Sequence, residues 1–139
     1  MENMFYVCRS LRELDLSNFN TTNVTNMSYM FFMCSSLREL DLQNFNTEKV
    51  TNMAYMFLNC SSLEKLEFGE NFNTINVTNM AYMFSGCSRL TKLELGESFN
   101  TSNVKNMGHM FYNCSSFPEE IQSKLNDVEE IIAFFKKDN

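Results

Sequence analysis

The chain has 139 residues and a formal net charge of −6. This length allows one modest domain, and the negative charge argues against nucleic acids and anionic membrane surfaces as principal partners. No apolar run approaches the roughly 18 residues of a membrane-spanning helix, and the first residues, MENMFYVC, lack the basic start and long apolar core of a signal peptide.

Equal spacing of the cysteines reveals a sequence repeat. The five cysteines follow one another at intervals of 26, 26, 27 and 27 residues, at Cys8, Cys34, Cys60, Cys87 and Cys114. Similar segments surround them: MFYVCRSLRELDL, MFFMCSSLRELDL, MFLNCSSLEKLEF, MFSGCSRLTKLEL and the shorter MFYNCSSF. Tandem copies of one unit predict a solenoid, in which each copy contacts only its neighbours.

Each copy is expected to contain a helix followed by a short strand. In the second copy the apolar residues fall on one face of a helix with 3.6 residues per turn, at Val24, Met27, Met30, Phe31 and Cys34. Asn20 or Thr21 is the expected N-cap of that helix. After a Ser-Ser pair, the ELDL segment at 39–42 alternates between polar and apolar residues, which predicts a strand buried on one face.

Stacking of these units predicts the overall shape. Parallel strands lie about 4.8 Å apart, whereas packed helices need about 8–10 Å between their axes. The predicted fold class is therefore α/β, a curved solenoid with one short parallel strand inside and one helix outside in each repeat. The repeats cover residues 1–117, about four in number, and the first is truncated because Met1 aligns with Met27 in the middle of the predicted helix. Such an uncapped end predicts a piece of a longer array or an end that another chain covers.

Residues 118–137 are expected to form a C-terminal capping helix of the same domain. Ser116, Pro118 and Glu119 have the pattern of a capping box with an early proline. A single apolar stripe follows, at Ile121, Leu125, Val128, Ile132 and Phe135. A partner-binding or coiled-coil helix is the alternative, although the stripe covers few heptads.

The repeat, in the form LRELDLxNFNTxxVTNMxYMFxxCSS, resembles the 26-residue leucine-rich repeats of BspA-like proteins. The similarity covers roughly residues 4–117 and recurs four times. It implies a leucine-rich-repeat-like solenoid and a surface or secreted protein of bacterial or protist type, active in adhesion and in binding host or partner proteins. The resemblance transfers no catalytic residues, and the chain lacks visible export and anchoring sequences.

Equivalent residues should stack in columns along the solenoid. Leucine columns, a phenylalanine spine and the eleven methionines are the expected core. Two asparagine columns are expected to hydrogen-bond the backbone of neighbouring repeats, at Asn20, Asn46, Asn73 and Asn100 and at Asn26, Asn52, Asn79 and Asn106. One extra residue in copies three and four, at Gly69 or Glu70 and at Gly96 or Glu97, predicts a small bulge after the strand.

The five cysteines are expected to be buried free thiols. Helices packed at about 8–10 Å would hold neighbouring cysteines beyond the roughly 7 Å that a disulfide allows between Cα atoms. A single file of cysteines also cannot surround one zinc ion. Cys8 and Cys114 are expected to be the most accessible, because they lie nearest the ends.

No catalytic, cofactor or metal site is expected. His109, the one histidine, replaces the tyrosines found at the same place in earlier copies, at Tyr29, Tyr55 and Tyr82. A general base needs a nucleophile or a second titrating group within hydrogen-bonding reach, and the sequence specifies neither. We therefore expect the protein not to be an enzyme and to need no cofactor.

The predicted binding residues lie on the exposed face of the strands. One column is entirely acidic, at Asp15, Asp41, Glu67 and Glu94, and a second is mixed, at Glu13, Glu39, Lys65 and Lys92. Arg12 and Arg38 flank them. One interpretation is an acidic recognition strip for a basic partner segment, and the other is a polar row that only keeps an exposed sheet soluble. A calcium site fits less well, because a flat ladder does not bring six to eight oxygens together. The Tyr29, Tyr55, Tyr82 and His109 column is a second candidate patch.

The sequence thus favours a noncatalytic protein-protein interaction module that binds a protein partner through its concave strand face. The family resemblance suggests the cell surface or secretion, with the cytoplasm as the alternative. The alternative function is a structural repeat segment that self-associates through its uncapped N-terminal end. Neither nucleic acid binding nor membrane insertion is expected.

Overall fold

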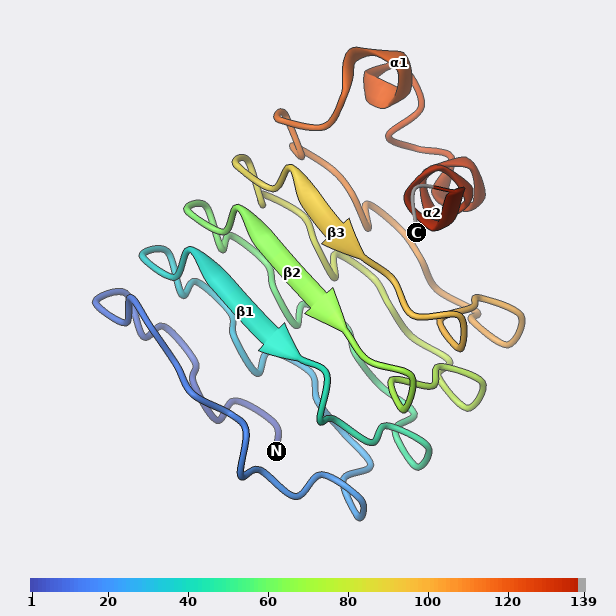
Figure 1. The fold of residues 1–139 in the computed structure, drawn as a ribbon. Helices are drawn as coiled ribbons and strands as arrows, with labels where there is room; N and C mark the ends of the chain where they lie inside the picture. Colours follow the sequence, from blue (N-terminus) through green and yellow to red (C-terminus); the bar gives the residue numbers. More distant parts are fainter. Residues whose placement is uncertain (138–139) are drawn as a thin grey trace.

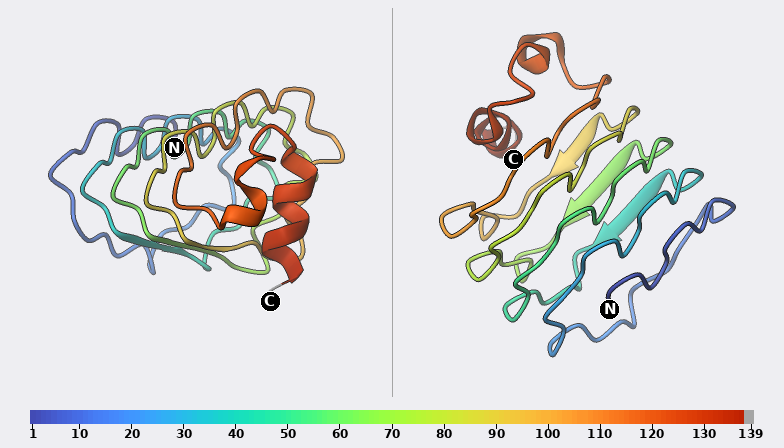
Figure 2. Two further views of the ribbon diagram at one scale, coloured as in Figure 1. Left: turned by 90° about the horizontal axis from the view of Figure 1, so that it is seen from above. Right: turned by 180° about the vertical axis from the view of Figure 1, so that it is seen from behind.

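A computed structural model of the protein describes residues 1–137. Within them lie three short strands, β1 (Glu39–Leu42), β2 (Lys65–Phe68) and β3 (Lys92–Glu94), followed by two helices, α1 (Glu119–Gln122) and α2 (Val128–Lys137). The strands form one parallel sheet in the order β1-β2-β3, and the chain winds around once between neighbouring strands (Figure 1). Helices α1 and α2 lie at the C-terminal end of the stack, beyond β3 (Figures 1 and 2).

The strand register follows the sequence repeat. Leu40 pairs with Leu66, and Leu66 pairs with Leu93. All three leucines are buried, whereas the residues that alternate with them face outward. The predicted strands are therefore confirmed in copies two to four. We number the repeats as residues 1–25, 26–51, 52–78, 79–105 and a partial fifth at 106–117.

The helix predicted in each repeat is wrong. Residues 27–34 form successive turns, and the backbone has positive φ at Tyr29 (57°) and Met33 (56°). The Met30 N–H donates to the Met27 carbonyl over 3.3 Å, and the Cys34 N–H donates to the Phe31 carbonyl over 3.1 Å. A bond across four residues with positive φ at the third is the pattern of a type II turn, which a right-handed helix cannot contain.

The turns of successive repeats stack into a continuous layer, which we call the turn row: residues 1–8, 27–34, 53–60, 80–87 and 107–114. Alternate N–H groups in this row donate to the next repeat, from Tyr29 to Ala54 (3.1 Å) and from Phe31 to Met56 (2.9 Å). The wider helical layer that was expected to curve the stack is therefore absent from residues 1–117. Backbone hydrogen bonds instead hold the repeats together on both sides.

The expected asparagine columns bond the backbone of their own repeat instead of a neighbour. Asn26 Oδ1 accepts from the Ser28 N–H (2.9 Å), and Asn20 Oδ1 accepts from the Thr22 N–H (3.1 Å). These bonds close Asx turns, so Asn20 is not a helix N-cap. The link to the next repeat comes from buried threonine hydroxyls, which donate from Thr21, Thr47 and Thr74 to the carbonyls of Asn46, Asn73 and Asn100.

The core runs along the stack between the sheet and the turn row. Phenylalanine rings stack in it at 5.5, 5.5 and 5.2 Å between centroids, at Phe31, Phe57, Phe84 and Phe111. Seven methionines are buried beside them, as predicted: Met27, Met30, Met53, Met56, Met80, Met83 and Met110. All five cysteines are free thiols, and Cys8 is only partly buried. Cys114 is fully buried, so the expectation that it would be accessible is wrong, because Phe117 and the C-terminal helices cover its end of the stack.

The first repeat lacks the predicted strand. Residues 11–16 have the sequence LRELDL, which is identical to that of 37–42, yet only the second copy contains a strand, β1. Leu40 is 2% exposed, whereas Leu14 is only partly buried. The same hexapeptide therefore pairs as a strand in the second repeat and not in the first, which has a neighbouring repeat on one side only.

Glycines accompany the extra residues of the third and fourth repeats, where a bulge was predicted. A Cβ atom on Gly69 would lie 2.2 Å from the Gln43 carbonyl oxygen, and one on Gly96 would lie 2.7 Å from the Gly69 carbonyl oxygen. The backbone after each strand therefore approaches the preceding repeat so closely that a side chain cannot fit.

The predicted C-terminal helix is two helices separated by a turn at 123–127. The expected capping box does not form, since the Ser116 hydroxyl donates to the Ser88 carbonyl (2.7 Å) and α1 has no side-chain cap. The apolar stripe packs on the last repeat, where the Phe135 ring contacts Phe117 edge-on at 4.8 Å. No helix within residues 1–137 is both long and apolar enough to cross a membrane.

Candidate interaction face

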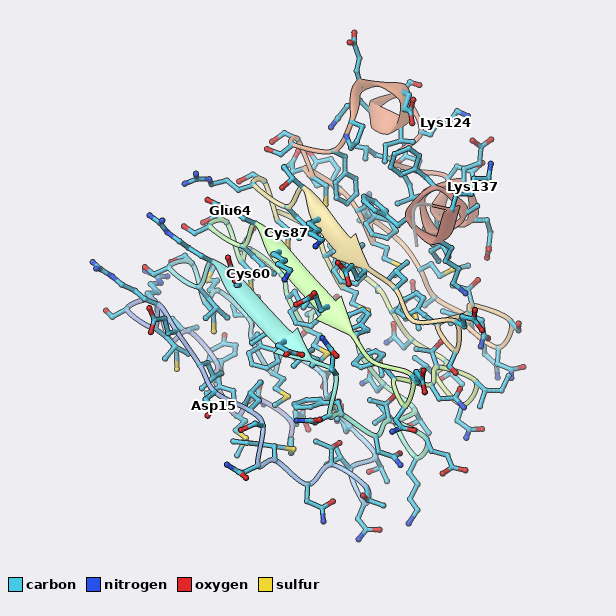
Figure 3. All side chains as sticks on the ribbon, in the orientation of Figure 1. Asp15, Cys60, Glu64, Cys87, Lys124 and Lys137 are labelled. Carbon is cyan, nitrogen blue, oxygen red and sulfur yellow. The ribbon has the colours of Figure 1, made fainter. Side chains whose placement is uncertain are left out.

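The sheet register brings most of the predicted binding residues together. Asp41 pairs with Glu67, and Glu67 pairs with Glu94, so these three carboxylates form a ladder across the exposed face of the sheet. The second column, formed by Glu39, Lys65 and Lys92, runs beside it. Glu13 and Asp15 belong to the first repeat, outside the sheet, and Figure 3 shows Asp15 there beyond β1.

Lysines neutralise the half of this face formed by β2 and β3. Lys65 Nζ lies 2.8 Å from a carboxylate oxygen of Glu67, and Lys92 Nζ lies 2.8 Å from one of Glu94. Each pair spans two residues of one strand, where side chains point to the same face. The hydrogen bond from Lys92 lowers the pKa of Glu94 against a smaller opposing effect of burial, and the bond to Glu67 raises the pKa of Lys65. These ion pairs could have been predicted from the Lys-x-Glu spacing on a strand.

The half formed by the first repeat and β1 keeps unbalanced carboxylates. Within residues 1–137 no ion pair involves its four acids, Glu13, Asp15, Glu39 and Asp41. Asp15 and Asp41 accept hydrogen bonds from the N–H groups of Ser17 (2.9 Å) and Gln43 (2.8 Å). The bond from the Ser17 N–H lowers the pKa of Asp15. This half of the face therefore holds four acidic side chains that form no ion pair among the described residues, although Lys65 still interacts electrostatically with Glu39.

A groove of about 890 Å³ crosses this acidic half. Its charged lining comes from the first repeat, β1 and the neighbouring strand: Arg12, Glu13, Arg38, Glu39, Asp41 and Glu67. Arg12 and Arg38 are exposed and make no ion pair in the described part of the chain. The groove thus offers carboxylates for a cationic segment and two guanidinium groups for acceptors such as carboxylates or carbonyls. No group of three or more His, Cys, Asp or Glu residues among the described ones could hold a metal ion.

The second predicted patch is a stack of aromatic rings on the turn row. Tyr29, Tyr55 and Tyr82 stack at 4.7 and 5.2 Å between centroids, and the His109 ring lies 5.0 Å from Tyr82. The three tyrosines are partly buried, and this burial raises the pKa of Tyr29. Because the rings lie face to face with one another, they present mainly their edges to a partner. Tyr6, whose ring stacks on Phe32 at 4.8 Å, extends the patch and was missed.

Comparison with known sequences and structures connects this repeat architecture to relatives. The sequence model of a family described as "Mycoplasma protein of unknown function, DUF285" matches residues 1–68 and again residues 66–139. The chain belongs to this family. The two matches to the DUF285 model meet within β2, so each covers about half of the repeats. No match is found among curated proteins.

A solved structure shares the fold of this DUF285 chain. The crystal structure of a leucine-rich repeat protein from T. pallidum superposes with a TM-score of 0.57 at 21% sequence identity. The match covers 91% of this chain and 52% of that protein, so the chain spans about half the length of its structural relative. At this identity the likeness supports a leucine-rich-repeat type of fold.

Proposed function

We propose that this chain is a noncatalytic protein-interaction module, a BspA-like leucine-rich-repeat solenoid that binds a partner through the exposed face of its sheet. The observation that carries the proposal is the asymmetry of that face. Lysines form ion pairs with Glu67 and Glu94, whereas Glu39 and Asp41 of β1 make no ion pair within residues 1–137 and lie beside an open groove. If these charged residues only kept the sheet soluble, there would be no reason for the carboxylates of one half of the face to remain without ion pairs.

The expected partner is a protein segment rich in lysine or arginine. Glu39 and Asp41 lie two residues apart on one face of β1, about 6.6 Å along the strand, so their carboxylates repel each other by roughly 0.6 kcal/mol in water. A bound cationic segment replaces this repulsion with attraction. Arg12 and Arg38 fix the segment's position by binding its carbonyl or carboxylate groups. A cell-surface or secreted setting, suggested by the BspA-like repeat, belongs to this proposal. Treating intact cells with protease distinguishes it from a cytoplasmic location.

A charge-matched pair of variants tests the site. The probe is a fluorescent twelve-residue peptide of alternating lysine and serine, titrated at low and physiological salt. The double substitution Glu39→Gln and Asp41→Asn should weaken binding about fivefold or more, since exposed ion pairs each contribute about 0.2–1 kcal/mol. The amide oxygen that Asp41→Asn introduces can still accept from the Gln43 N–H, so the fold is retained.

The control is Glu119→Gln with Glu120→Gln, which removes the same charge from exposed positions on α1. It should change the affinity less than twofold. Equal losses in the two double variants would show that the peptide responds only to net charge, and the proposed binding face would be wrong.

A further inference from the structure

The first repeat exposes backbone acceptors that are occupied everywhere else in the turn row. In the third repeat, the carbonyls of Ala54, Met56 and Leu58 each accept an N–H bond from the repeat before. The equivalent carbonyls of the first repeat belong to Glu2, Met4 and Tyr6. Within residues 1–137 these three accept no hydrogen bond. We call the outward side of residues 1–25 the N-terminal face.

Side-chain donors on this face also lack the acceptors that their equivalents have. Cys34 Sγ donates to the Phe5 carbonyl of the preceding repeat (3.1 Å), and the later cysteines donate in the same way. Cys8 has no such acceptor in the described chain. Likewise Asn44 donates back to the Ser17 carbonyl (3.2 Å), whereas Asn18 reaches only the adjacent Ser17 hydroxyl at 3.5 Å.

Apolar side chains of the same face are incompletely covered. Four side chains of the second repeat are only 0–2% exposed: Phe31, Leu37, Leu40 and Phe45. Their equivalents in the first repeat are only partly buried: Phe5, Leu11, Leu14 and Phe19. Met4 and Tyr6 are each 50% exposed. Four observations thus agree: the free carbonyls, the Cys8 thiol, the exposed apolar side chains and the lack of a strand at 11–16. Each is explained if the first repeat can pack against a further repeat on its outward side.

We infer that the N-terminal face is an interaction surface for a polypeptide segment of this same repeat type, running parallel to the first repeat. The occupant supplies N–H donors at alternate residues of an MxYMFxxC turn, as Tyr29 and Phe31 do toward the third repeat. Its phenylalanine carbonyl accepts from the Cys8 thiol, and its ring stacks on Phe5 as Phe5 does on Phe31, at 5.4 Å. The interface already present between repeats therefore continues outward.

The polarity of the turn row rules out pairing it with the turn row of a second copy. If a two-fold axis ran along this row, the carbonyls of one copy would face those of the other, and both rows would lack donors. The far end of a second copy is covered by α1 and α2 (Figure 2). There the Phe117 ring packs on Phe135. The occupant must therefore present the donor edge of a repeat that carries no cap.

A tandem extension tests the inference through the reactivity of Cys8. The full chain is extended before Met1 by a second copy of residues 27–52, which continues the repeat in phase, and the control carries the same residues in shuffled order. Alkylation of the native proteins by iodoacetamide is followed at each cysteine by peptide mass spectrometry. We expect Cys8 to react at least tenfold more slowly in the in-phase protein than in the shuffled one, and the cysteine of the added copy to become reactive. Equal Cys8 rates in the two folded proteins would overturn the inference.

A second substitution tests whether the protection of Cys8 depends on packing at the N-terminal face. Met4→Glu, placed in the in-phase protein, puts a charge where the equivalent Met30 and Met56 are fully buried, so Cys8 should react again at the rate of the shuffled control. Tyr112→Glu, at a 52% exposed position of the last repeat, should leave Cys8 protected. A Cys8 rate unchanged by Met4→Glu would also contradict the inference. Neither result depends on peptide binding by the acidic groove.

Discussion

Gly69 shows how a single residue sets the spacing of two repeats. The inserted residue after β2 brings the Gly69 backbone against Gln43 so closely that a Cβ atom would lie 2.2 Å from the carbonyl oxygen. That oxygen belongs to the backbone and cannot rotate away. A larger residue here must therefore push the second and third repeats apart.

Gly69→Ala should lower the free energy of unfolding by about 1–3 kcal/mol, the usual cost of overpacking. Urea denaturation measures this loss. Gly108→Ala is the control, because its nearest new contact would be Asn106 Oδ1 at 3.5 Å, and alanine already occupies the equivalent positions 54 and 81. A loss in Gly108→Ala as large as that in Gly69→Ala would contradict the explanation by close approach.

At the scale of elements, the C-terminal helices pack on the last repeat through one buried stripe of apolar side chains. Ile131 is fully buried and Phe135 is 6% exposed, whereas the neighbouring Phe134 is only partly buried. Polar contacts reinforce the packing, because the Thr101 hydroxyl donates to Glu129 and the Lys136 ammonium donates to the Glu97 carbonyl (3.2 Å). Helix α2 therefore closes the hydrophobic core of the last repeat.

Phe135→Ala should cost about 3–5 kcal/mol of unfolding free energy, as for other buried phenylalanines. Phe134→Ala should cost less than half as much, because that ring is partly exposed. Urea midpoints of the two variants, measured side by side, check the difference. If both substitutions cost the same, packing of α2 on the last repeat would not be the source of the stability.

The strands could be predicted from the sequence, whereas the turn row could not be separated from a helix. Spacing of three, one and three residues, as in Met27, Met30, Phe31 and Cys34, places side chains on one face of a helix. Two consecutive four-residue turns produce the same spacing, because each brings its first and last residues together. One column held a partial signal: Asn59, Gly86 and Asn113 are residue types that tolerate positive φ, whereas Val7 and Met33 at the same place in the first two repeats are not. The positive φ of Tyr29 has no such signal and depends on hydrogen bonds to the next repeat.

The position of the candidate site and its Lys-x-Glu ion pairs were predictable, but the missing strand of the first repeat was not. A correct alignment of the repeats is enough to place Asp41, Glu67 and Glu94 in one column. The open acidic half depends on the first repeat, where LRELDL forms no strand although the same residues form β1 in the second. Sequence cannot distinguish two identical hexapeptides; only the neighbours that each one contacts in the fold do so.

At the scale of the whole molecule, a column of buried thiols links the repeats. Burial raises the pKa of Cys34 from 9.0 to about 11 and that of Cys114 to about 12, and it raises those of Cys60 and Cys87 further. The folded protein therefore keeps thiol protons that the unfolded chain releases above pH 9. The thiols' contribution to stability is complete below that pH and is lost as the pH rises.

The free energy of unfolding should accordingly fall above pH 9, by about 1.4 kcal/mol per pH unit for each thiol that remains protonated only in the folded state. Between pH 9 and 11 the free energy of unfolding of the Cys60→Ala variant should fall less steeply than that of the parent protein. Below pH 8 the two curves of free energy against pH should be parallel. Urea denaturation across this range provides the measurement. Identical slopes above pH 9 would show that Cys60 ionises with equal ease in both states.

The one-way hydrogen bonds of the turn row also give that row a net electric dipole. In a sheet, neighbouring peptide dipoles largely cancel, whereas in a helix they add. Tyr29, Tyr55 and Tyr82 all donate toward the C-terminal end, so the dipoles of their row add along the stacking axis. The carbonyl oxygens of the first repeat form its negative pole, and the N–H groups of the last repeat form its positive pole. Each added repeat would lengthen the dipole of this row without reversing it, whereas backbone bonds elsewhere in the stack, such as that from the Glu64 N–H to the Arg38 carbonyl, point the opposite way.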